Sequence, residues 1–160
     1  MQALDLRIRV HGWALVQVQD ESTVWSYTVG LVENYDHPEL TLLDADLDVA
    51  SWLLTRLADD IAARGELSAG LVRKLGVQCV EVHDDHLHSD LFGTWSNRYG
   101  CLVPPGDMLQ VLLPDCAYCD GHAHVVRRLD RPGPTPPPPP PLLPPNREER
   151  RRRGRGGHAA

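Results

Sequence analysis

The chain has 160 residues, of which 42% are hydrophobic and 24% are charged. This length suits about one folded domain, since domains usually contain roughly 100 to 200 residues. Residues 1–126 hold 19 acidic against 7 basic residues, a net charge of −12, whereas residues 127–160 hold 9 arginines against 3 acids, a net charge of +6. An acidic domain repels phosphate backbones, which argues against nucleic-acid binding and leaves only weak, non-specific contact by the arginine-rich tail.

Membrane insertion and secretion are also disfavoured. No apolar run approaches the roughly 18 to 20 residues that span a bilayer. Residues 1–10 alternate Arg and Asp with apolar residues and lack the continuous apolar stretch of a signal peptide. Four cysteines without a secretory signal predict reduced thiols and a cytoplasmic location.

The first third of the chain has the patterns of β-structure. Residues 13–18 alternate apolar and polar side chains, and residues 23–31 are rich in β-branched and aromatic ones. With the polar turn at 19–22 between them, they predict an antiparallel hairpin. The turn-forming stretch 34–38 then leads to a third short strand at 40–43.

Residues 46–64 predict a helix that packs on one face of the sheet. Aspartates suit its start, where backbone N–H groups are unpaired, and Arg64 followed by Gly65 suits its end. The apolar residues recur at steps of three and four, which places one stripe toward the core. The members of this stripe are Leu47, Ala50, Leu54, Leu57 and Ile61.

Two more strands are predicted at 77–83 and 108–113, and residues 90–100 predict a short helix or a loop. The expected fold is therefore α+β, with a mainly antiparallel sheet of about four to six strands. From residue 131 onward the composition reduces to Pro, Arg and Gly, including six consecutive prolines at 136–141. This proline-rich tail predicts disorder, since it lacks the apolar area that a core requires.

Three stretches resemble a known family. They are His11-Gly12-Trp13, Tyr27-Thr28-Val29-Gly30-Leu31 and His37-Pro38-Glu39-Leu40. Together with the helix that follows and the strand near residue 110, they resemble the bacterial family called domain of unknown function 4262. The resemblance implies a shared fold and a shared surface around these motifs, but no reaction. It covers residues 1–115, which leaves 116–130 as a Cys- and His-bearing extension and 131–160 as the tail.

The first candidate site lies at the edge where the second strand ends and the third begins. A histidine with a glutamate in reach can act as a general base with its orienting group, and a glycine lets a ligand approach the backbone. The structural alternative, in which these residues build a tight turn and fill the core, is favoured. Candidate catalytic residues are His11, Tyr27, His37 and Glu39, and candidate ligand-binding residues are Tyr27, Thr28, Gly30 and His37.

A second candidate is a metal site formed by Cys116, Cys119, His122 and His124. These donors suit zinc, although four ligands within nine residues would force a cramped loop. A Cys-x-x-Cys redox pair is the alternative. A third candidate, the His- and Asp-rich stretch at 83–90, has donors for a hydrolytic metal centre, but a solvated acidic loop is favoured because consecutive side chains cannot converge.

No phosphate loop, dinucleotide glycine fingerprint or Gly-x-Ser-x-Gly elbow occurs in the sequence. The order of elements bears a loose likeness to flavin-binding split barrels, but few basic residues are available to hold a flavin phosphate. We therefore expect a small-ligand or partner-binding module centred on the Tyr27–Glu39 edge. The alternatives are a small enzyme that uses His37 and Glu39 as acid and base, or a metal-binding protein.

Overall fold

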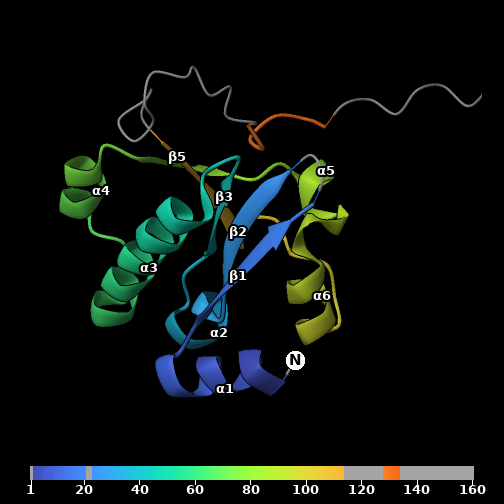
Figure 1. Cartoon of the computed structure of the whole chain (residues 1–160), viewed down its shortest axis with the longest axis horizontal. Helices are drawn as coiled ribbons and strands as arrows, with labels where there is room; N and C mark the ends of the chain where they lie inside the picture. Colours follow the sequence, from blue (N-terminus) through green and yellow to red (C-terminus); the bar gives the residue numbers. More distant parts are fainter. Residues whose placement is uncertain (1, 21–22, 114–127, 134–160) are drawn as a thin grey trace, which may run out of the picture.

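A computed structural model describes residues 2–20, 23–113 and 128–133 (Figure 1). The helices are α1 (Gln2–His11), α2 (Leu31–Tyr35), α3 (Leu47–Arg64), α4 (Ala69–Leu75), α5 (Asp84–Leu87), the 3-10 helix η1 (Asp90–Phe92) and α6 (Gly93–Tyr99). The strands are β1 (Ala14–Gln19), β2 (Val24–Val29), β3 (Glu39–Leu43), β4 (Gln78–Glu81) and β5 (Met108–Leu112).

The five strands form one sheet in the order β1-β2-β3-β5-β4. All neighbours are antiparallel except β3 and β5, which run parallel. In the β1–β2 hairpin, Ala14 pairs with Val29 and Gln19 pairs with Val24. The predicted α+β fold, its mainly antiparallel sheet and its N-terminal hairpin are thus confirmed.

The predicted long helix is confirmed as α3, and its ends have the expected chemistry. The Asp46 carboxylate accepts hydrogen bonds from the backbone N–H groups of Asp48 (2.9 Å) and Val49 (3.3 Å), so it caps unpaired donors of the first turn. At the other end Gly65 has φ +79°, and its N–H donates to the carbonyl of Ile61. The sequence therefore defines both ends of this helix.

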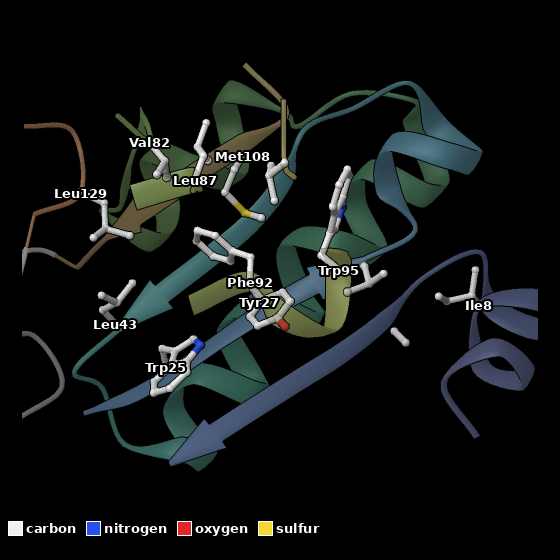
Figure 2. Packing of buried hydrophobic residues seen from close by; sticks show 13 residues of the cluster. Ile8, Trp25, Tyr27, Leu43, Val82, Leu87, Phe92, Trp95, Met108 and Leu129 are labelled. Carbon is white, nitrogen blue, oxygen red and sulfur yellow. The ribbon is translucent and has the colours of Figure 1, made fainter. Parts of the chain in front are cut away.

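Helices cover both faces of the sheet. Helices α3 and α4 lie on one side, and α5, η1 and α6 lie on the other (Figure 1). Leu40 and Leu42 of β3 pack toward α3, whereas Leu43 packs toward the opposite layer. Figure 2 shows this second core, which includes Trp25, Tyr27, Phe92, Trp95 and Met108. The middle strands are buried on both faces, as a three-layer arrangement requires.

The segment 128–133 is anchored to the β4 and β5 end of the sheet through Leu129. Leu129 is fully buried in the core that Figure 2 shows. Its N–H donates to Oε1 of Gln110 at 2.6 Å, and its carbonyl accepts from the N–H of His83 at 2.7 Å. The division into 1–115, 116–130 and a disordered tail stays a prediction, and its residues 116–127 and 134–160 lie outside the described part of the chain.

Helices α2 and α5 differ from the sequence-based expectation, and a third segment takes the helical one of its two predicted alternatives. Helix α2 begins before the predicted turn at 34–38, and Asp36, with φ +53°, ends it. Residues 84–87 form α5 where an acidic loop was expected, because the His83 side chain caps it by accepting from the N–H of Asp85. Residues 90–99 form η1 and α6, the helical alternative for that stretch. In the described ranges, no helix is long and apolar enough to cross a membrane.

Candidate functional site

The carboxyl group of Glu39 lies at the centre of a buried hydrogen-bond network. Its Oε1 accepts from the backbone N–H groups of Gly30 (2.6 Å) and Val32 (3.3 Å), and its Oε2 accepts from the Thr28 hydroxyl (2.7 Å). The Thr28 oxygen in turn accepts from the N–H of Leu40 at 2.8 Å. Glu39 and Thr28 are fully buried, so this network joins the end of β2, the start of α2 and the start of β3.

Burial raises the pKa of Glu39 from 4.5 to about 7, although the hydrogen bonds from Thr28, Gly30 and Val32 oppose the shift. A carboxyl group that titrates near neutral pH has the property that general acid–base catalysis needs. The same group has no exposed surface. Its position therefore favours the structural interpretation of this residue.

Two glycines bring the α1–β1 corner onto this network. Gly30 has φ +111°, and a Cβ at this position would lie 2.7 Å from the carbonyl oxygen of Gly12. Side chains of α2 hold the same corner: Nδ2 of Asn34 donates to the Gly12 carbonyl (2.8 Å), and the Tyr35 hydroxyl donates to the His11 carbonyl (3.1 Å). The three family-like stretches are thus one contiguous structural unit.

The structure unites only some of the residues proposed for the first candidate site. Thr28, Gly30 and Glu39 meet as described. Tyr27 packs edge-on against Phe92 in the opposite core, and its hydroxyl accepts from the N–H of Thr94 at 3.2 Å. The Nδ1 atom of His37 lies 2.7 Å from the carbonyl oxygen of Pro38, and within the described residues no hydrogen bond joins it to Glu39.

The two candidate metal sites differ in whether the structure describes their residues. Cys116, Cys119, His122 and His124 lie outside the described residues. In the described ranges, no three His, Cys, Asp or Glu side chains gather as a metal site would require. Within the 83–90 stretch, His83 caps α5 and Nε2 of His86 lies 2.9 Å from the carbonyl of Arg131.

An open groove of 480 Å³ lies between α1, the start of β1 and α3. Helix α1 crosses the end of the sheet where β1 begins, and α3 flanks it (Figure 1). Its apolar lining residues are Trp13, Ala14, Leu15 and Ala62. Its polar lining residues are Arg7 and His11 from α1, and Ser51, Thr55 and Asp59 from α3. We refer to it as the His11 groove.

The polar side chains of the His11 groove are uncommitted. Among the described residues, none of the five makes a side-chain hydrogen bond or ion pair. The neighbouring Asp60 shows the contrast, because its carboxylate accepts from Arg64 at 3.0 Å and from the N–H of Ser68 at 2.9 Å. A few polar groups together with apolar side chains are typical of small-ligand sites.

Sequence reasoning found His11 but missed the other groove residues. Arg7 and His11 stand four apart, and so do Ser51, Thr55 and Asp59, which places each set on one helical face. The polar stripe on α3 was readable beside the apolar one. The groove itself was not, because residues 1–10 were not identified as a helix.

A second hollow of 390 Å³ lies at the far end of the β1–β2 hairpin. Its acidic side chains include Asp20, Asp44 and Asp46. Asp20 accepts from the N–H of Thr23 at 2.7 Å, and Asp46 caps α3. The carboxylates of Asp20 and Asp46 serve local turns, so the His11 groove is the better candidate site.

Comparison with known proteins identifies a family. The family model described as a domain of unknown function (DUF4262) matches residues 7–118. No curated protein matches the chain, and no solved structure matches it. The matched region contains all three family-like stretches and every residue that lines the His11 groove. The chain therefore belongs to the DUF4262 family, as the resemblance of its motifs predicts.

Proposed function

We propose that this protein is a small-ligand-binding module and that its ligand occupies the His11 groove. The observation that carries the proposal is the set of five uncommitted polar side chains that line one hollow: Arg7, His11, Ser51, Thr55 and Asp59. A volume of 480 Å³ lies within the roughly 300–1,000 Å³ typical of ligand pockets.

The buried network around Glu39 supports this proposal by giving the groove a rigid edge. Gly12 directly precedes Trp13, which lines the groove. The Gly12 carbonyl accepts from Asn34, and it fills the space where a Cβ at position 30 would lie. The motif residues would then act as the support for a neighbouring binding surface, since ligand sites need positions fixed by packed surroundings. In this interpretation the family-like residues still belong to the functional surface, but the ligand binds beside the α1–β1 corner instead of at the Tyr27–Glu39 edge.

The test is a fragment screen of the full chain by two-dimensional amide NMR, with small carboxylates, amines, amino acids and sugars as probes. We expect at least one probe to shift the amides of α1, the start of β1 and the centre of α3. Thr55→Trp should fill the groove and abolish these shifts. Arg56→Trp, which adds the same ring at an exposed position of the same helix, should leave them unchanged.

The other interpretations stay predictions. A binding or catalytic centre at the Tyr27–Glu39 edge is favoured by the neutral-range pKa of Glu39 but opposed by its burial. Probe-induced shifts confined to the amides of residues 27–39 would support that centre and contradict the His11 groove. For zinc at Cys116 and Cys119, stoichiometric metal in protein purified without a His tag is the required result.

A further inference from the structure

We infer that the ligand of the His11 groove is a small zwitterion, such as an amino acid or a short peptide. The inference rests on the proposed function and concerns the chemical class of the ligand. Its basis is the charge of the lining, because Arg7 of α1 and Asp59 of α3 both line the groove.

Because the lining carries one positive and one negative charge, a ligand whose charges all have the same sign is not the best fit. Arg7 and Asp59 belong to different helices, and no ion pair joins them in the described structure. A monoanion would be attracted by Arg7 but repelled by Asp59. A monocation would be attracted by Asp59 but repelled by Arg7. A ligand with one carboxylate and one ammonium group satisfies both charges, since each opposite pair forms a charge-assisted hydrogen bond.

The remaining lining suits the connecting part of such a ligand. The hydroxyls of Ser51 and Thr55 can donate to or accept from a peptide or side-chain polar group. Trp13 and Leu15 add apolar surface to the lining. Along α3, Ser51 and Asp59 are eight residues apart, which corresponds to about 12 Å at a rise of about 1.5 Å per residue. This length accommodates molecules from a single amino acid to a dipeptide.

The experiment titrates the full chain with glycine, γ-aminobutyrate, 6-aminohexanoate and glycylglycine, which differ in charge separation. Propionate and propylamine provide the single charges. Amide NMR follows the shifts, and isothermal titration calorimetry gives the affinities. We expect at least one zwitterion to bind at the His11 groove at least about tenfold more tightly than either single-charge probe, because two charged hydrogen bonds replace one.

Variants then test the two charges. Arg7→Gln and Asp59→Asn should each weaken binding of that zwitterion by about tenfold or more. The double variant Arg7→Glu with Asp59→Lys should recover binding, because a zwitterion can enter in the reverse orientation. Arg9→Gln and Glu66→Gln, which remove the same charges from exposed positions outside the groove, should change nothing.

The outcomes separate the two proposals. Groove shifts with propionate, propylamine or a neutral sugar that match or exceed those of every zwitterion would overturn the zwitterion and leave the binding site standing. A zwitterion affinity that survives both single substitutions would also overturn it. No groove shift with any probe, in folded protein, would overturn the binding function and the ligand class together.

Discussion

Glu39 places a titratable group inside the domain, and its chemistry controls stability as well as structure. The folded protein holds the Glu39 proton up to a pKa of about 7, whereas the unfolded chain releases it near the ordinary value of 4.5. Between these values the unfolded chain binds fewer protons, so the free energy of unfolding falls as pH rises. The contribution is complete below about pH 4.5 and lost above about pH 7.

Replacement of Glu39 by Gln tests this linkage. Gln keeps an acceptor for Gly30 but does not titrate. The difference in free energy of unfolding, wild type minus variant, should therefore fall by about 3 kcal/mol between pH 4.5 and 7 and then level off. Urea unfolding at several pH values measures it, and other carboxyl groups cancel in the difference. A difference that rises with pH would mean that the carboxylate is ionised in the folded state.

At Gly30, the backbone of Gly12 occupies the space that a side chain would need. With φ +111° and the Gly12 carbonyl oxygen 2.7 Å from an added Cβ, Gly30→Ala should destabilise the domain by about 2–4 kcal/mol. Gly65→Ala is the matched control, because φ is +79° there but no atom lies within 4 Å of the added carbon. It should cost about 1 kcal/mol. Equal melting temperatures for the two variants would contradict this account.

Among the elements, α1 depends on contacts far along the chain. The guanidinium of Arg98 in α6 donates to Asp5 of α1 and to Glu33 of α2, the latter at 2.9 Å. The Arg98 side chain is only 17% exposed, and Tyr99 also donates to Glu33. A planar fork can bridge two carboxylates at once, which a lysine ammonium does less well.

Arg98→Lys should therefore loosen α1 without unfolding the domain. Hydrogen exchange of the α1 amides should accelerate about fivefold, equivalent to about 1 kcal/mol, while the α3 amides keep their protection. Arg64→Lys, at an exposed i,i+4 pair with Asp60, is the control and should leave α1 unaffected. Unchanged α1 exchange in Arg98→Lys would show that the Arg98 bridge does not hold the helix.

The elements also show how much of the fold can be predicted from sequence patterns. Strong helical periodicity predicted α3 and its caps, and alternation predicted the strands. In α1 the apolar residues Leu4, Leu6, Ile8 and Val10 alternate as they would in a strand, yet the segment is a helix. Only Ile8 is fully buried, and Leu6 (60%) and Val10 (64%) are exposed. Tertiary contacts override the pattern here, so the groove that α1 borders could not be predicted from sequence alone.

At the scale of the whole molecule, the core includes a residue that lies beyond the region 1–115 covered by the family resemblance. Leu129 lies only two residues before the start of the proline-rich composition, yet it is fully buried. Leu129→Ala should cost about 2–5 kcal/mol, as buried leucine truncations do. Leu102→Ala, at a side chain that is 52% exposed, should change stability by less than about 0.5 kcal/mol. Chemical unfolding of both full-length variants measures the contrast.

The parallel pairing of β3 with β5 has a consequence for synthesis on the ribosome. In the finished sheet, β5 lies between β3 and β4, so among the described strands β4 pairs with β5 alone. During synthesis, 64 residues, from Asp44 to Asp107, must therefore be added after β3 before β5 is made, and β5 is the strand that joins β3 to β4. Until then the open side of β3 is available to other chains, and chaperone demand should be greatest in this interval.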